Sequence, residues 1–344
     1  MFENFFGNAP AAAVLAGMVR GGRIPQTLLL AGPEGVGKAT LARRFAAALL
    51  GGAADIERDD LSLAANAELL GEREKLPGEK RAEEPLMFGA HPDFLTFPPD
   101  GPLRQISIQQ MRLLKERAQF GPLHGRRRVF LIDQIDRANE QAANSLLKTL
   151  EEPPPYLIVV MTAQNPYDLL PTIRSRSIPV HLTPLTDAEV LAFARGRGLS
   201  DLDRRVALAG GSPGVAASVD LAAYDRRRAA MLALLETAAS RATWAAWARH
   251  SDTLAQSRSE KLENHLKVLY LLLEDILRLA NGGGGIRNAD VRPRLESLAG
   301  AVSFAWIRRA VGKVDELAGL LRRNIQRGIA LDALVIELRS APGG

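Results

Sequence analysis

The stretch RVFLIDQIDRANEQAANSLLKTLEEPPPYLIVVMTAQNPYDLLPTIRSRS, residues 128–177, decides the fold of this chain. Two apolar runs, residues 129–132 and 156–161, each end in polar residues, which is typical of buried parallel strands that present side chains at their carboxyl ends. Between them, residues 140–152 carry apolar side chains at three- and four-residue spacing and stop at three prolines, which indicates an amphipathic helix. The order strand, helix, strand places Asp133 on one rim of a sheet, where open α/β folds bind ligands.

The loop GPEGVGKA, residues 32–39, is expected to face that rim and has the form of a phosphate-binding loop. It follows a short apolar run and opens a helix predicted over about residues 38–50, which is the context that the pattern requires. Gly32, Gly35 and Gly37 let backbone N–H groups converge on phosphate oxygens, and the helix N-terminus adds its positive end. Lys38 is placed to reach the terminal phosphates.

The loop departs from the phosphate-binding pattern at one position. After the lysine the pattern has Ser or Thr, whose hydroxyl binds Mg²⁺, but Ala39 stands there and the hydroxyl has moved to Thr40. One residue along a helix is a rotation of about 100°, so Thr40 is a poor replacement. Two interpretations stay open. The loop, Thr40 and Asp133 form a degenerate phosphate and Mg²⁺ site with some nucleotide affinity, or the loop is only a turn between a strand and a helix.

Composition limits the class of protein. A chain of 344 residues with 47% hydrophobic residues is long enough for two or three domains with their own cores. It has no cysteine, which excludes disulfides and thiolate metal sites and fits a reducing cytoplasm. No apolar run approaches the roughly 18 residues of a membrane span, and the start MFENFFGN is unlike a secretory signal. The net charge of +5 mildly favours a polyanionic partner.

Apolar runs alternate with helical patterns as far as residue 181 and not beyond it, which predicts a parallel sheet followed by an all-helical remainder. Five strands are expected, near residues 27–31, 94–97, 129–133, 157–162 and 177–181. Residues 52–88 interrupt this order with a charged stretch, which we interpret as a solvated, partly helical surface insertion. The basic triplet at residues 126–128 is interpreted as a solvated strand entrance, with a phosphate contact as the alternative.

These motifs together resemble the AAA+ subunits of bacterial clamp loaders, and most of all the delta prime subunits of DNA polymerase III. The resemblance rests on AGPEGVGKATLARRFA, VFLIDQIDRANEQAANSLLKTLEEPP, DLLPTIRSRS, GGSPG and RGIALDALVIELRS, and it spans nearly the whole chain apart from the insertion. NSLLKTLEEPP with IRSRS is far more specific than a phosphate loop alone. The resemblance implies a RecA-like AAA+ P-loop domain over residues 1–183, a small helical lid over 184–219, and a helical collar over 220–344 that joins five subunits in a ring.

Departures from the family pattern indicate which kind of subunit this chain resembles. The ATP-hydrolysing subunits carry Asp-Glu after the third strand, where the glutamate positions the attacking water; here the pair is Asp133-Gln134. Those subunits also carry the hydroxyl that Ala39 lacks, and a lid arginine at the place of Gly214. Three losses on three elements argue against a working ATPase. Many relatives bind zinc through four cysteines in the region of the insertion, and because this chain has none we assign neither zinc nor another metal.

One catalytic feature of the family is retained. The Ser-Arg-Cys triplet of clamp-loader subunits supplies an arginine finger to the ATP of a neighbouring subunit, and here the triplet is Ser175-Arg176-Ser177. Such an arginine is worth roughly 10³- to 10⁵-fold in rate. The alternative is that Arg176 only pairs with a carboxylate on its own surface.

The resemblance therefore implies a non-hydrolysing clamp-loader subunit that is not an enzyme by itself. It is expected to bind ATP weakly or not at all, and to join gamma/tau and delta subunits in a hetero-pentameric ring in the cytoplasm. Through that complex it is expected to meet the sliding clamp and primed DNA, with no membrane partner. One alternative is an ATP-hydrolysing, gamma/tau-like motor subunit. A second is a P-loop kinase, which would leave NSLLKTLEEPP and the helical C-terminal third unexplained.

Overall fold

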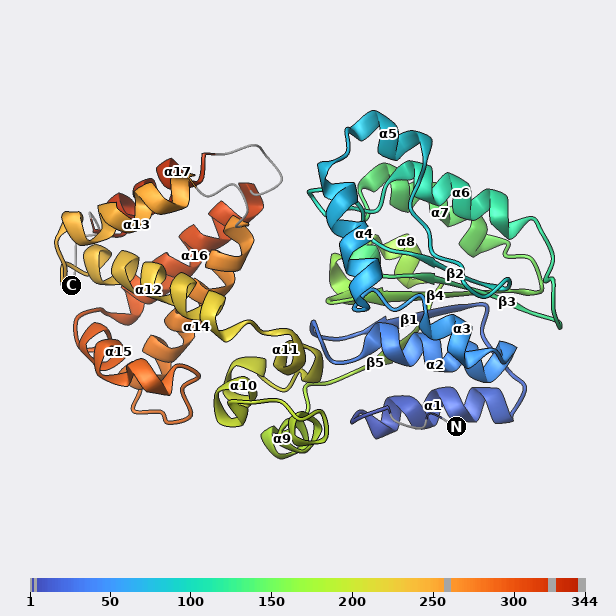
Figure 1. Cartoon of the computed structure of the whole chain (residues 1–344), viewed down its shortest axis with the longest axis horizontal. Helices are drawn as coiled ribbons and strands as arrows, with labels where there is room; N and C mark the ends of the chain where they lie inside the picture. Colours follow the sequence, from blue (N-terminus) through green and yellow to red (C-terminus); the bar gives the residue numbers. More distant parts are fainter. Residues whose placement is uncertain (1, 3–4, 257–260, 321–325, 340–344) are drawn as a thin grey trace. The chain divides into compact units, whose positions relative to one another are not determined.

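The computed structural model describes residues 2, 5–256, 261–320 and 326–339 (Figure 1). The chain divides into two compact units. Unit 1 comprises residues 1–199 and 209–216, and unit 2 comprises residues 200–208 and 217–344. The expected lid, residues 184–219, contributes to both units, and the division into three domains stays a prediction.

Unit 1 is built on a five-stranded, fully parallel sheet with the order β2-β3-β4-β1-β5. The strands are β1 Thr27–Ala31, β2 Phe94–Phe97, β3 Arg128–Ile132, β4 Leu157–Ala163 and β5 Ile178–His181. The predicted sheet is thus confirmed, with shifts of one residue at some strand ends. Asp133 directly follows β3 rather than ending it, and its backbone N–H still bonds to the Phe97 carbonyl oxygen of β2. Ser177 precedes β5.

Helices cover both faces of this sheet, which is why its strands are apolar without alternation. Along β3, Val129 and Leu131 pack toward α1 and α2, whereas Phe130 and Ile132 pack toward α6 and α7 (Figure 1). The helices of unit 1 are α1 Ala9–Arg20, α2 Lys38–Leu50, α3 Ala53–Glu57, α4 Ala64–Lys75, α5 Gly78–Glu83, α6 Ile108–Ala118, α7 Glu140–Glu151, α8 Pro171–Arg174 and α9 Asp187–Gly196, with 3-10 turns η1 Ile135–Arg137 and η2 Pro166–Asp168. The short helices α10 Leu202–Ala209 and α11 Pro213–Ser218 follow.

The insertion at residues 52–88 is helical, as predicted, but it is not merely a solvated excursion. It forms α3, α4 and α5, and four of its charged residues make ion pairs or hydrogen bonds with other parts of unit 1. Arg73 is 8% exposed, and its Nε and Nη2 donate to the two carboxylate oxygens of Asp100 at 3.0 and 2.7 Å. Asp59 is 2% exposed and accepts hydrogen bonds from the Ala90 amide and the Thr96 hydroxyl. Arg43 of α2 reaches Glu57 and Asp60 of the insertion.

The interpretation of the basic triplet as a solvated strand entrance is wrong for Arg128, which is 6% exposed. Its Nη1 donates to the carbonyl oxygens of Arg117 and Phe120 at 2.8 and 2.9 Å, and its guanidinium lies over the Phe130 ring. The fully buried Asp93 lies 3.8 Å from Arg128 Nε. Because these internal groups occupy the side chain, Arg128 is a structural residue and does not offer the phosphate contact considered as the alternative.

All regular elements in the described residues of unit 2 are helices, as expected. Besides most of α10, its elements are α12 Leu221–Ala238, α13 Trp244–Gln256, α14 Leu262–Ala280, η3 Ala289–Val291, α15 Arg292–Ala299, α16 Phe304–Leu320 and α17 Arg327–Arg339. The helix α14 packs against α12, α15 and α16 and supplies the centre of the core. Asp332 of α17 accepts hydrogen bonds from Trp247 Nε1 and Ser251 Oγ of α13 at 2.7 and 2.8 Å. Among the described helices of both units, none has the length and apolar character to cross a membrane.

Candidate nucleotide site and surface arginine

The phosphate-binding pattern forms a tight loop between β1 and α2. Gly35 and Gly37 have φ angles of 77° and 98°, which side-chain-bearing residues rarely adopt. Gly32 is needed for a different reason, because a Cβ there would lie 2.2 Å from the Leu182 carbonyl oxygen that follows β5. The three predicted glycines are therefore required by the backbone whether or not a phosphate binds, so their presence alone does not separate the two interpretations of the loop.

Lys38, the first residue of α2, bonds to its own loop. Its ammonium donates to the carbonyl oxygens of Gly32 and Pro33, both at 2.6 Å, and the residue is 8% exposed. Burial lowers the pKa of the Lys38 ammonium below its ordinary value, and the charges of Asp133 and Asp136 oppose that shift. Two of the three N–H bonds of the ammonium are thus committed to protein oxygens rather than pointing to open solvent.

The polar groups after β3 and β4 are bonded to each other. Thr162 Oγ1 donates to Asp133 Oδ1 at 2.6 Å, and the Gln134 amide donates to the same hydroxyl oxygen at 2.7 Å. Burial raises the pKa of the Asp133 carboxyl, and the Thr162 hydroxyl opposes that shift. Gln134 has a left-handed φ of 57°, so the residue standing where ATPase subunits have glutamate lies at a sharp turn of the chain. Lys38 and Asp133 lie close enough for the charge of each to influence the pKa of the other, and their role in a phosphate and Mg²⁺ site stays a prediction.

The segment at residues 211–216 closes over this loop. The Gly214 amide donates to the Gly35 carbonyl oxygen at 2.8 Å. A Cβ on Gly35 would lie 2.9 Å from the Val215 nitrogen, and a Cβ on Gly214 would lie 2.9 Å from the Gly35 oxygen. The Phe5 ring lies 3.0 Å from the Cβ position of Gly37. The loop is therefore in contact with two other segments of unit 1.

These contacts test whether the residues fit Mg²⁺ and a nucleoside triphosphate. Ala39 carries no hydroxyl, and Thr40 is the third residue of α2, about 100° further round the helix. The Lys38 ammonium is bonded to loop carbonyls, and the Asp133 carboxylate is bonded to Thr162. In this arrangement the site does not fit a catalytic Mg²⁺–nucleotide complex. Across the described ranges, no group of three or more His, Asp or Glu side chains is placed to hold a metal ion.

Arg176 lies elsewhere in unit 1, in the turn between α8 and β5. Its side chain is 33% exposed, and its Nη2 lies 2.7 Å from Oε1 of Glu151, the last residue of α7. Its Nη1 donates to the Thr172 carbonyl oxygen at 3.0 Å. Ser177, which replaces the cysteine of the family triplet, is 7% exposed and donates to the Ile173 carbonyl oxygen at 2.6 Å. Arg176 thus pairs with a carboxylate on the surface of its own chain, Glu151, as the alternative interpretation expected.

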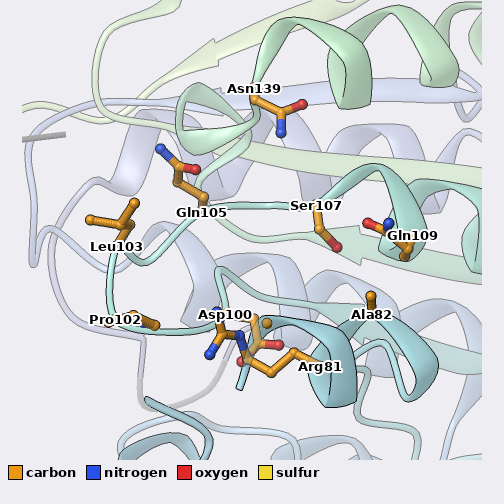
Figure 2. Close-up of a pocket in the computed structure, with 10 residues that line it drawn as sticks. Arg81, Ala82, Asp100, Pro102, Leu103, Gln105, Ser107, Gln109 and Asn139 are labelled. Carbon is orange, nitrogen blue, oxygen red and sulfur yellow. The ribbon is translucent and has the colours of Figure 1, made fainter. Parts of the chain in front are cut away.

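A separate pocket of about 190 Å³ lies between α5 and the segment that leads into α6 (Figure 2). Figure 2 shows Ser107 and Asn139, the N-caps of α6 and α7, across the hollow from Arg81 and Asp100. The Asp100 carboxylate is already paired with Arg73. The pocket has no cluster of titratable groups for acid–base chemistry, and we assign it no site.

Sequence reasoning found the loop residues, Asp133 and Arg176, but it missed two contacts that define their environment. It identified Gly214 only as the place of a missing arginine, whereas the structure shows its amide bonded to Gly35. It did not identify Glu151 as the partner of Arg176. The two glutamates before the prolines at residues 153–155 are a signal that could have suggested Glu151. Acidic residues at a helix C-terminus interact unfavourably with the helix dipole, so a nearby cation would stabilise them.

Comparison with known proteins gives one family. Residues 7–186, just over half of the chain, match the family described as "DNA polymerase III, delta subunit". The DNA polymerase III subunit delta' of Pseudomonas aeruginosa is 29% identical over 334 residues, covering 92% of each chain. The subunit delta' of Escherichia coli is 26% identical over 76% of this chain and 78% of its own. A DNA polymerase III gamma subunit-related protein of Thermotoga maritima aligns over 94% of this chain and 98% of its own, at 16% identity and a TM-score of 0.43.

Proposed function

This chain belongs to the DNA polymerase III delta-subunit family, and from that premise we propose that it serves the clamp loader as a delta prime subunit that does not hydrolyse ATP itself. Its catalytic contribution is Arg176, given in trans to the ATP of an adjacent subunit. The observation that carries this proposal is a contrast in burial between two sites in unit 1. Lys38 is 8% exposed and bonded within its own loop, whereas the Arg176 side chain, although paired with Glu151, stays 33% exposed in a surface turn.

Three features support a chain that does not turn over ATP. Ala39 and Gln134 lack the hydroxyl and the carboxylate that a P-loop ATPase uses for Mg²⁺ and for the attacking water. The Gly214 backbone N–H donates a hydrogen bond to the Gly35 carbonyl oxygen of the loop. We therefore propose that this chain binds ATP weakly or not at all, and that it carries no zinc.

The position of Arg176 supports a role toward a neighbour. Leu169 and Ile173 are buried against the sheet, so the turn that follows is anchored while the arginine itself stays at the surface. An arginine is charged at every physiological pH, and its planar fork suits phosphate oxygens. A guanidinium supplied from another subunit stabilises the charge that develops on the transferred phosphoryl group. This arrangement makes hydrolysis by the neighbour depend on assembly.

The proposed setting is a hetero-pentameric ring with gamma/tau and delta subunits in the cytoplasm. Within it, this chain contributes to opening the sliding clamp and loading it on primed DNA. Contact with DNA would go through Lys and Arg to the phosphate backbone, because the chain has a modest positive charge and no base-reading motif. Relatives named as tau/gamma subunits match this chain over about half of its length, which supports a common family of subunits.

The test is ATP turnover and clamp loading by assembled complexes that carry the wild-type chain or Arg176→Ala. The variant should fold and join the ring. ATP turnover at the one site that receives Arg176 should fall by about 10³-fold or more. The total turnover of the complex should therefore fall by at least the fraction that this site contributes. Arg176→Lys should restore only part of it, because an ammonium lacks the planar fork.

The matched control is Arg174→Ala, two residues earlier, at the end of α8. Arg174 lies over the Tyr167 ring at 5.2 Å, so it has an intramolecular role and should leave turnover unchanged. Equal turnover and normal loading with Arg176→Ala would remove the finger role and leave Arg176 as a surface ion-pair residue.

A further inference from the structure

The partner of Arg176 within its own chain is placed on a rigid element. Glu151 ends α7, whose side chains Leu146 and Leu150 are buried against the sheet. Asn139 caps the start of the same helix by accepting a hydrogen bond from the Ala142 amide at 2.8 Å. The helix is thus fixed at its start and along its buried face. The backbone that carries Glu151 is therefore held in a fixed position.

The base of the arginine is fixed as well. The Ser177 hydroxyl, buried next to Arg176, bonds to the Ile173 carbonyl oxygen, and the Arg176 amide bonds to the same oxygen at 3.2 Å. The guanidinium itself is held by Glu151 at Nη2 and by the Thr172 carbonyl at Nη1. Both ends of this long side chain are therefore set by groups that belong to the fold.

The way in which Glu151 holds the arginine leaves donors for another ligand. A guanidinium has five N–H bonds. The Thr172 carbonyl oxygen accepts one of them, and the Ser175 hydroxyl is a distant second acceptor at 3.4 Å. Glu151 Oε1 forms an ion pair with Nη2 at 2.7 Å. Within the described residues, Nε and at least one N–H of the terminal nitrogens have no protein acceptor. A carboxylate that gripped the fork with both oxygens would have occupied the edge that a phosphate needs.

Glu151 also lies at the C-terminal end of α7, where the helix dipole disfavours a negative charge. Carboxylates near a helix C-terminus are destabilised by the helix dipole, so Glu151 adds nothing to the stability of α7 by itself. Its neighbour Glu152 has the same charge and exposure, and in the described part of the chain it makes no ion pair. The contrast between these two glutamates indicates that the position of Glu151 matters because of Arg176.

We propose that Glu151 is a positioning residue for the arginine finger: it holds the Arg176 guanidinium by one edge, in the surface turn, with the other N–H groups directed to the phosphates of an adjacent subunit. This inference rests on the proposed trans role of Arg176. Arginine side chains lose about 2 kcal/mol of rotamer entropy when they are fixed. Glu151 fixes much of that freedom before the neighbouring ATP arrives, so the finger needs less ordering in the transition state.

The experiment measures kcat and KM for ATP of assembled complexes that carry Glu151→Ala, Glu151→Gln or the control Glu152→Gln. Glu151→Ala should lower kcat about two- to five-fold, the range for an exposed ion pair, and leave KM unchanged, since the finger acts on the transition state. Glu151→Gln should lie between, because the amide oxygen still accepts a hydrogen bond. Glu152→Gln should match the wild type. Circular dichroism should show all three variants folded, because removing an acidic residue from this helix end does not weaken the helix.

A double-mutant cycle separates positioning from other effects. If Glu151 acts through Arg176, Glu151→Ala should add nothing in the Arg176→Ala background. The inference is overturned if Glu151→Ala leaves kcat unchanged, if it raises kcat, as a residue that sequesters the finger would, or if it lowers kcat equally in both backgrounds. A loss with Arg176→Ala but none with Glu151→Ala would overturn this inference alone, whereas no loss with Arg176→Ala would overturn the proposed function as well.

Discussion

Arg43→Met tests how the charged insertion is attached to the helix that follows the phosphate loop. Arg43 lies on α2 and is 2% exposed. Its Nε lies 3.0 Å from Glu57 Oε2, and its Nη2 bonds to Asp60 Oδ2. One buried guanidinium thus joins α2 to two carboxylates of the insertion. Methionine keeps the unbranched length of the side chain and removes its charge and donors.

The loss of stability follows from the burial of the three groups. Breaking a buried ion pair by removing one partner costs about 3–5 kcal/mol, because the remaining charge stays uncompensated. Here the two carboxylates are 26% and 27% exposed, so water can solvate them in part, and Glu57 keeps Arg44 with an N–O distance of 3.1 Å. We therefore expect unit 1 to lose about 2–3 kcal/mol, below the buried range but well above the ~0–1 kcal/mol of an exposed pair.

The assay can follow each unit separately. All three tryptophans of the chain, at positions 244, 247 and 306, lie in unit 2, so their fluorescence reports on that unit. In denaturant, Arg43→Met should shift the circular-dichroism transition of unit 1 and leave the fluorescence transition unchanged. Tryptic cleavage at Lys75 and Lys80, both in the insertion, should become faster.

The control for this experiment is Arg58→Met in the same insertion. The Arg58 side chain is 72% exposed and 3.8 Å from Asp55, so its loss should cost less than about 0.5 kcal/mol. A loss with Arg43→Met as small as that of Arg58→Met would refute the reasoning. It would mean that the insertion is held by its apolar residues and not by this buried guanidinium.

Two further predictions concern the nucleotide loop. The isolated chain with Mg²⁺ and ATP should show no steady-state turnover above that of Lys38→Ala; a rate that this substitution abolishes would indicate a gamma/tau-like motor instead. Asp133→Asn should raise the melting temperature of unit 1 at neutral pH, because burial raises the pKa of this carboxyl and so penalises its ionised form in the folded state. That penalty is fully present above the folded-state pKa and fades as pH falls toward the ordinary value of about 3.8, so the advantage of Asn should shrink over that window. A melting-temperature difference that is negative at pH 7, or the same at pH 4 and pH 7, would contradict this.

The parts of the fold that sequence predicted well are those with purely local causes. The strand at 27–31 and the helix at 38–50 are observed at those residues, because an apolar run, a glycine loop and a helix-forming segment follow one another directly. The helix at 140–152 ends one residue early, at Glu151, ahead of three prolines. Ser107 caps α6 through the reciprocal bonds with Gln110 that its sequence context favours.

The contacts that sequence did not predict join residues far apart in the chain. Arg128 is buried because Asp93 lies beside it and because the carbonyls that end α6 accept its N–H groups, and nothing in an Arg-Arg-Arg triplet distinguishes the third residue from the first. The pair of Glu151 with Arg176 needs the placement of α7 beside α8, which spacing along the chain does not give. A single sequence shows which groups are charged but not which of them find partners.

The bond between Gly35 and Gly214 changes how the degenerate site should be understood. From sequence, the missing hydroxyl at Ala39, the missing carboxylate at Gln134 and the missing lid arginine at Gly214 count as three separate losses. In the structure, the third is coupled to the shape of the loop, because any side chain at 214 would bring a Cβ within 2.9 Å of the Gly35 oxygen. A glycine there lets residues 211–216 pack directly on the loop, with the Gly214 amide bonded to the Gly35 carbonyl oxygen. The glycine at 214 and the packing on the loop are therefore one structural feature. We therefore expect that restoring the hydroxyl at position 39 and the carboxylate at position 134 would not by itself produce ATP turnover, because the segment at 214 would still lie against the loop.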